Sequence, residues 1–143
     1  PLRKLVLYAA APAVALVGFS GIMPDLACVG HAPMSALERN ASRVGPDSLL
    51  MTSSHLVGAL NWQYRRTDVV IVRGAGELAY GMGRAANDHR LVLLEEFGDF
   101  AATHAGQGRL TLFLTDSSYA GLEPMLPPPL YLDRASGFVF AQF

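Results

Sequence analysis

The feature that most constrains this chain is an uninterrupted apolar run near its start, residues 5–23 (LVLYAAAPAVALVGFSGIM), which contains no charged side chain. As a helix with a rise of about 1.5 Å per residue, this run would be about 28 Å long, close to the hydrocarbon thickness of a bilayer. Apolar residues occur all around such a helix, without the polar stripe of a soluble surface helix. The sequence therefore predicts a transmembrane helix over residues 1–24 rather than a buried core helix.

Residue types within the run favour a helix that belongs to a bundle over a lone anchor. Pro12 predicts a kink, and the small residues Gly18 and Gly21 allow neighbouring helices to approach closely. A signal peptide is the third interpretation. It is disfavoured because the run is longer than a typical signal core and no A-x-A cleavage site follows promptly.

The charges on either side of the run predict its orientation. Arg3 and Lys4 directly precede it, whereas Asp25 follows it and the next basic residue is Arg39. Because basic residues are retained on the cytoplasmic side, we expect everything after the run to lie outside the cytoplasm, which in a bacterium is the periplasm.

Composition excludes several classes of protein. Apolar residues make up 51% of the chain and charged residues 16%, which excludes a disordered tail. Eleven basic and twelve acidic side chains give a net charge of -1, so the general basic surface of a nucleic-acid-binding protein is absent from the sequence. A single cysteine, Cys28, excludes an internal disulfide framework and a multi-cysteine zinc site.

The remainder of the sequence predicts an α/β fold. Residues 25–46 are interpreted as a connector with an amphipathic helix, and residues 47–143 as one small α/β domain. We expect strands at 48–53, 68–73, 91–93 and 110–115, helices at 54–64, 95–104 and 116–125, and a C-terminal hairpin formed by 130–132 and 138–143. This alternation predicts three layers, with a mostly parallel sheet between helices and the hairpin at one edge. Ser54 and the Asp116-Ser117-Ser118 segment are the expected helix N-caps.

Two segments are candidates for binding phosphate. Arg65 and Arg66, between a helix and a buried strand, are candidate substrate-binding residues that would clamp a phosphate or approach lipid headgroups. The alternative is a favourable interaction with the helix C-terminus. The segment from Gly74 to Gly76 follows a strong strand, as a dinucleotide-binding loop does, but Ala79 stands where that motif needs its third glycine. A tight turn is the better interpretation.

Candidate metal ligands and catalytic acids are few. His55 follows a strand end, where open α/β sheets bind ligands, and His31 lies near the end of the apolar run. Either histidine would suit a divalent metal if other segments completed the site. The alternative is an ordinary surface histidine, and no cofactor is assigned. Glu96 and Asp99 form either a carboxylate pair or a solvated helix face, and Asp116 follows a strand where either a catalytic acid or a helix cap would stand.

Residues 60–81 (LNWQYRRTDVVIVRGAGELAYG) resemble the C-terminal extracytoplasmic domain of the aminoarabinose transferase (ArnT) family. In that family the pattern W-x-x-[KR]-R-[ST]-D precedes an apolar strand, and G-E-L-x-Y-G closes the loop after it. The two patterns stand here at residues 62–68 and 76–81. The resemblance extends over about residues 48–143, and the preceding apolar run is similar to the last transmembrane helix of the family.

The resemblance implies a specific function. Members of the family are inner-membrane glycosyltransferases of the GT-C type, with many spans before a periplasmic C-terminal domain. They move 4-amino-4-deoxy-L-arabinose from undecaprenyl phosphate to lipid A phosphates, which confers resistance to cationic peptides such as polymyxin. Their catalytic acids lie in earlier periplasmic loops, so no catalytic residue is assigned to this chain. Its implied partners are the upstream transmembrane part of the same polypeptide, the lipid substrates and the membrane, and its implied role is an accessory cover over the membrane cavity.

Two alternatives remain open from the sequence. One is a related polyprenyl-phosphate glycosyltransferase that uses another sugar or another acceptor, such as protein. The other is a periplasmic binding or assembly module on a single membrane span, with no catalytic part.

Overall fold

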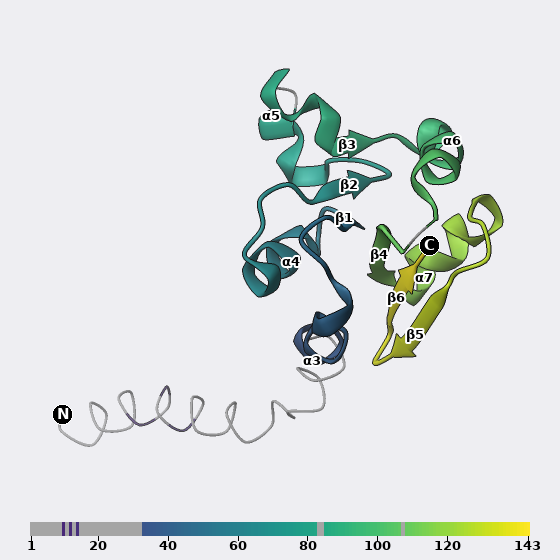
Figure 1. The fold of residues 1–143 in the computed structure, drawn as a ribbon. Coiled ribbons are helices and arrows are strands. Elements are labelled where there is room, and N and C mark those ends of the chain that lie inside the picture. The colour runs from purple at the N-terminus through teal and green to yellow at the C-terminus, as the bar shows by residue number, and fades with distance from the viewer. Residues whose placement is uncertain (1–9, 11, 13, 15–32, 83–84, 107) are drawn as a thin grey trace. The chain divides into compact units, whose positions relative to one another are not determined.

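The structure, a computed structural model, describes residues 10, 12, 14, 33–82, 85–106 and 108–143. The chain divides into two compact units, Pro1–Ala32 and Pro33–Phe143, and the fold described here is that of the second unit (Figure 1). The transmembrane helix predicted from the sequence falls almost wholly outside the described residues. Among the residues that are described, no helix is long and apolar enough to cross a bilayer. The domain boundaries expected at residues 24 and 46 stay predictions.

A six-stranded sheet in the order β3-β2-β1-β4-β6-β5 forms the centre of the described part of the chain. Neighbours among β1 to β4 are parallel, whereas β6 runs antiparallel to β4 and β5 antiparallel to β6. The mostly parallel sheet with a C-terminal hairpin at its edge, expected from the sequence, is therefore confirmed. The strands are β1 Leu49–Thr52, β2 Val70–Val72, β3 Leu91–Val92, β4 Leu110–Thr115, β5 Tyr131–Ala135 and β6 Phe138–Gln142.

Helices cover both faces of the sheet, which confirms the three layers (Figure 1). Residues of α6 and α7 pack on one face, and residues of α3 and α4 pack on the other. The α-helices are α3 Met34–Arg39, α4 Val57–Tyr64, α5 Ala79–Met82, α6 Leu94–His104 and α7 Asp116–Leu122. The 3-10 helices are η1 Ala41–Arg43, η2 Gly76–Leu78, η3 Ala85–Arg90 and η4 Glu123–Met125.

Two hydrophobic cores lie on opposite faces of the sheet because successive strand residues point to opposite sides. On β4, Leu112 and Leu114 join Phe97 of α6 and Tyr119 of α7, whereas Phe113 joins the core beneath α3 and α4. The run LTLFLT of β4 is apolar apart from its threonines. This composition is expected of a central strand in a sheet that is covered on both sides.

The order of the strands creates a topological switch point. The chain moves outward from β1 to β2 and β3, then returns to place β4 on the other side of β1. The carboxyl ends of β1 and β4, near Thr52 and Thr115, therefore lie at the position where open α/β sheets usually bind ligands.

Both helix caps predicted from the sequence are wrong. Leu56, not Ser54, is the N-cap of α4, and no side chain caps that helix, because residues 53–56 first close a turn through the bond from Leu56 N to Ser53 O. At α7 the cap is Thr115, whose hydroxyl oxygen accepts a hydrogen bond from Ser118 N at 3.3 Å. Thr115, the last residue of β4, has the extended backbone of an N-cap, so its hydroxyl faces the first free N–H groups of α7. Asp116 is already the first residue of the helix and therefore does not cap it.

The hairpin is tighter than the sequence suggested. Strand β5 runs on to Ala135, so the turn is reduced to Ser136 and Gly137, with φ of 54° and 81°. Two-residue hairpin turns with positive φ at both positions match the right-handed twist of the strands. The alternating exposure of β5 is that of an edge strand, which the sequence analysis interpreted in part as loop.

Candidate functional site

The two arginines proposed as a phosphate clamp lie where α4 ends. Arg65 adopts a left-handed conformation with φ of 52° and donates its backbone N–H to Asn61 O, and Arg66 N donates to the same oxygen at 3.3 Å. This is the usual way for a helix to end on a left-handed residue, although glycine is normally found there. The turn sends the two side chains into different surroundings.

Arg66 is held by an acidic neighbour. Its Nε donates to Asp68 Oδ1 at 2.8 Å, its Nη2 donates to Asp68 Oδ2, and its Nη1 donates to Gly45 O at 3.4 Å. The hydrogen bonds from Arg66 lower the pKa of the Asp68 carboxyl group. The same hydrogen bonds are the largest cause of the raised pKa of Arg66. Arg66 is therefore largely neutralised by Asp68.

Arg65 remains available to a ligand. Its side chain is exposed and makes no hydrogen bond or ion pair within the described part of the chain. Both arginines line a groove of about 500 Å³ beside β2, whose lining residues are Val44, Gly45, Pro46, Tyr64, Arg65, Arg66, Thr67 and Asp68. The structure thus brings both residues to one groove but leaves Arg65 as its free cation.

Trp62 presents a large aromatic surface beside this cation. The side chain is 78% exposed on α4, and Arg65, three residues further, is the left-handed residue that ends that helix. Trp62 is also the only tryptophan of the chain. An exposed tryptophan with a basic neighbour is typical of surfaces that meet the membrane interface.

Among the described residues, no metal site is assembled around the predicted ligand His55. His55 is exposed in the turn after β1, and His31 lies outside the described residues. Within residues 33–82, 85–106 and 108–143, no three His, Cys, Asp or Glu side chains are placed to share a metal ion. The role of His55 and His31 as ligands therefore stays a prediction.

The remaining candidates have structural roles or solvated positions. Glu96 and Asp99 are exposed on α6, and Asp116 is the exposed first residue of α7. The segment from Gly74 to Gly76 leads into η2 and the four-residue helix α5, not into a long helix that could hold a dinucleotide. The tight-turn interpretation therefore fits this segment.

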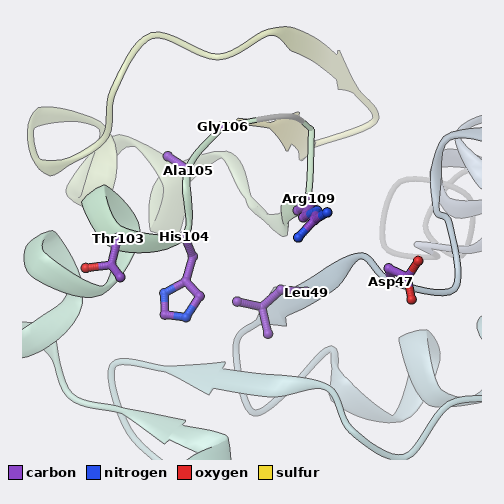
Figure 2. Close-up of a pocket in the computed structure, with 7 residues that line it drawn as sticks. All are labelled: Asp47, Leu49, Thr103, His104, Ala105, Gly106 and Arg109. Atoms are coloured by element: carbon purple, nitrogen blue, oxygen red, sulfur yellow. The ribbon is translucent and has the colours of Figure 1, made fainter.

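A second cavity, of about 460 Å³, lies at the amino ends of β1 and β4 and was not predicted from the sequence. It is lined by Asp47, Leu49, Thr103, His104, Ala105, Gly106 and Arg109 (Figure 2). In Figure 2 the Leu49 side chain lies between the His104 ring and Asp47, and Arg109 projects from the loop above it. Asp47 lies two residues before β1 and Arg109 directly precedes β4, but only the order of strands in the sheet makes these strands neighbours.

Arg109 and Asp47 share this cavity without pairing. Their side chains are exposed and form no ion pair or hydrogen bond with each other or with the rest of the described chain. His104 is fixed differently: its Nδ1 lies 2.8 Å from Phe100 O, and its ring stacks on Phe100. A carbonyl oxygen only accepts, so Nδ1 donates in this hydrogen bond, and Nε2 can accept when the ring carries a single proton.

Comparison with known proteins decides the family. The family model described as "Arabinosyl transferase ArnT, C-terminal domain" matches residues 30–142. The chain belongs to this family. The resemblance seen in residues 62–68 and 76–81 is thereby confirmed. In this ArnT C-terminal domain the first pattern forms the end of α4 and the entry to β2, and the second forms η2 with the start of α5.

Curated relatives are much longer than the chain. An undecaprenyl phosphate-alpha-4-amino-4-deoxy-L-arabinose arabinosyl transferase of Proteus mirabilis is 26% identical over 94 residues, which are 65% of this chain and 17% of that protein. The corresponding transferase of Edwardsiella ictaluri is 28% identical over 95 residues, 66% of this chain and 17% of that protein. One of Yersinia pestis is 24% identical over 116 residues, 80% of this chain and 21% of that protein.

Solved ArnT structures share the fold. The crystal structure of ArnT from Cupriavidus metallidurans bound to undecaprenyl phosphate matches with a TM-score of 0.60 and 18% identity, over 79% of this chain and 20% of that one. The apo structure of the same protein gives a TM-score of 0.59 and 20% identity over 80% of this chain and 20% of that one. The ArnT C-terminal domain thus keeps its α/β fold at low sequence identity.

Proposed function

We propose that this chain is the C-terminal part of an integral inner-membrane glycosyltransferase that moves 4-amino-4-deoxy-L-arabinose from undecaprenyl phosphate to a lipid A phosphate. The observation that carries the proposal is the match of the ArnT C-terminal domain family to residues 30–142. The printed names of the Proteus and Edwardsiella relatives, which include both the sugar and its lipid carrier, support it. The added amine would lower the negative charge of lipid A and so reduce binding of polymyxin.

Within that protein the α/β domain acts as a periplasmic accessory cover and not as the catalytic centre. No group of metal ligands is assembled in the described residues, and the catalytic acids of the family are expected upstream of this chain. The partners that fit this role are the upstream transmembrane part of the same polypeptide and the lipid substrates.

The outer side of α4 is the surface by which the domain meets lipid. Trp62 supplies an amphipathic ring for the interface, and Arg65 supplies an unpaired cation for a phosphate group. Arg66, tied to Asp68, positions the turn that carries Arg65 and adds a weaker attraction for phosphate. His55 and His31 stay candidate metal ligands that would need groups from elsewhere in the protein.

The first experiment measures the native polypeptide in bacterial membranes with an antibody against residues 47–143. A band several times heavier than 15.3 kDa supports a multi-span transferase, whereas a band near 15.3 kDa contradicts it and favours a single-span periplasmic module. Membranes carrying the native polypeptide are then supplied with different lipid-linked sugars, and the modified lipid A is detected by mass spectrometry. Transfer of another sugar, or transfer to protein, would favour the related polyprenyl-phosphate glycosyltransferase.

The second experiment tests Arg65 in the native membrane protein by replacing it with glycine. Arg65→Gly removes the cation and also relieves the left-handed backbone, so the variant folds at least as well as the wild type. We expect the KM for the lipid substrate to rise about fivefold, or about 1 kcal/mol, with kcat little changed. Arg65→Lys, the matched control, keeps the charge and retains most of the affinity. Equal KM values for all three proteins would exclude a role for Arg65 in lipid binding.

A further inference from the structure

We propose that the cavity formed by Asp47, Leu49, His104 and Arg109 is a binding site for one phosphorylated amino sugar. The site lies at the amino ends of β1 and β4, and it is separate from the groove that holds Arg65 and Arg66. Nothing in the proposed transfer reaction requires it.

Two opposite charges, Asp47 and Arg109, line the cavity without neutralising each other. Neither side chain forms a hydrogen bond or an ion pair in the described part of the chain, and the charge of Asp47 acts on Arg66 only as the smallest of the effects on the pKa of that arginine. Arg66 and Asp68, in contrast, neutralise each other through a direct ion pair. A ligand that carries both an anion and a cation can satisfy both side chains at once.

Arg109 indicates which anionic group the ligand carries. A guanidinium presents donors in a planar fork that matches the oxygens of a phosphate group. Arg109 is held at the mouth of the cavity by its own backbone, since Leu49 N donates to Arg109 O at 2.7 Å and Arg109 N donates to Gly106 O at 3.4 Å. Its side chain is left free to meet a phosphate.

The other residues that line the cavity indicate the rest of the ligand. Asp47 accepts hydrogen bonds and attracts an ammonium group, and Nε2 of His104 can accept when the ring carries a single proton, because Nδ1 is engaged with Phe100 O. The C-terminal end of α6, which bears His104, also favours positive charge. Leu49 and Ala105 supply an apolar surface between these polar groups, on which a sugar ring can lie.

Size agrees with this chemistry. Small-molecule sites commonly occupy about 300–1,000 Å³, so the observed 460 Å³ accommodates one monosaccharide with its phosphate rather than a long chain. The same chemistry is carried by a soluble sugar phosphate and by the headgroup of a lipid-linked amino sugar.

The test is a titration of the 143-residue chain, isotope-labelled in uncharged maltoside micelles, followed by NMR. Glucosamine 1-phosphate is the probe, and glucose 1-phosphate, glucosamine and inorganic phosphate are the comparison ligands. We expect glucosamine 1-phosphate to shift the signals of Leu49, His104 and Arg109 with a dissociation constant of about 1 mM or below. Glucose 1-phosphate should bind about fivefold more weakly, because it leaves Asp47 without an ammonium partner.

Variants separate a built site from general attraction. Arg109→Gln should weaken binding about tenfold, and Asp47→Asn should abolish the preference for the amino sugar. Both side chains are exposed and form no hydrogen bond or ion pair in the described chain, so both variants should fold. Arg134→Gln is the matched control, because Arg134 lies on β5 near the other end of the sheet and pairs there with Glu123. Equal loss in Arg109→Gln and Arg134→Gln, or equal affinity for the two sugar phosphates, would overturn the proposal, as would the absence of any shift.

A second titration distinguishes the two sources of ligand. The same chain is mixed with short-chain lipid-linked glucosamine phosphate at equal concentration. Tighter binding than that of glucosamine 1-phosphate, with the same residues shifted, assigns the site to a lipid headgroup, and equal or weaker binding assigns it to a soluble sugar phosphate. These titrations measure binding and not glycosyl transfer. A negative titration would therefore overturn the proposed site and leave the proposed transfer reaction intact, and a loss of the transfer reaction would leave the site intact.

Discussion

The side-chain nitrogen of Asn40 donates a hydrogen bond of 2.8 Å to Asp133 Oδ2 and so joins the end of α3 to the edge strand β5. Asn40 is completely buried, and its Nδ2 also donates to Ala36 O at 2.9 Å. Arg39 Nε donates to the same oxygen of Asp133 at 2.9 Å. Two successive residues thus hold one carboxylate that is distant in sequence, and they tie the last hairpin to the first described helix.

Asn40→Ala is expected to destabilise the domain by about 2 kcal/mol, because it removes a buried hydrogen bond to a charged group. The measurement is the free energy of unfolding in urea. Arg39→Ala is the control, and it should cost at most about 1 kcal/mol since the Arg39 side chain is half exposed. Similar losses in both variants would contradict the greater importance of the buried contact.

Asp133 should also contribute to stability in a pH-dependent way. Its pKa is lowered, first by the hydrogen bond from Asn40 and then by Arg39. A lowered pKa in the folded state means that the contribution is present above the unfolded pKa of about 3.9 and is lost as pH falls below it. The urea midpoints of wild type and Asp133→Asn should therefore differ at pH 6 and converge as pH falls below about 4. A difference that stays constant across this range would argue against the carboxylate.

Much of the fold could be predicted from the sequence, because burial on both faces leaves a clear pattern. Strand β4 was expected at residues 110–115 and is found there, since six consecutive residues avoid charge between two turn segments. The edge strand β5 was predicted less well. Its exposed positions are Leu132 and Arg134, and the charged residues Asp133 and Arg134 look like loop residues until the partner strand is known.

The candidate sites were harder to predict, because they depend on which segments the sheet brings together. Arg66 pairs with Asp68, only two residues away, yet no pattern in the sequence indicates that Arg66 rather than Arg65 is the arginine that pairs. The cavity of Asp47 and Arg109 requires β1 and β4 to be neighbours, and these strands are separated by two others in the chain. Strand order is a property of the whole domain, so local patterns do not reveal it.

Gly76 occupies a position where a side chain would be strained. Its φ is +53°, and an added Cβ would lie 3.1 Å from Ser54 Oγ. Gly76→Ala is therefore expected to lower the stability by about 1–2 kcal/mol. Gly74→Ala is the matched control, because no atom lies within 4 Å of its added Cβ and its φ is not positive. Thermal unfolding measures both, and an equal effect would contradict this account of the turn.

Tyr64 connects α4 to α3, and its phenol should ionise at a higher pH than an exposed tyrosine. Its hydroxyl donates to Leu37 O at 3.1 Å, and burial raises the pKa of Tyr64 to about 12. A raised pKa means that this contribution to stability is present below the unfolded pKa of about 10 and is lost as pH rises toward 12. Tyr64→Phe should cost about 1 kcal/mol at neutral pH. In an ultraviolet absorbance titration the variant should lack one ionisation near pH 12, and a missing ionisation near pH 10 would instead indicate an exposed phenol.

Trp62 offers a direct test of the surface proposed to meet lipid, because its fluorescence is the only tryptophan signal of the 143-residue chain. In liposomes that contain anionic phospholipid, we expect its emission to shift to the blue and to be quenched by brominated acyl chains, since the ring would leave water for the interface. Arg65→Gly should reduce the quenching, because the cation that draws α4 to the phosphates is gone. Arg134→Gln, which removes a cation from the strand β5, should leave the quenching unchanged. An emission maximum equal to that of free tryptophan, with no quenching in the wild type, would show that this side of α4 stays in water.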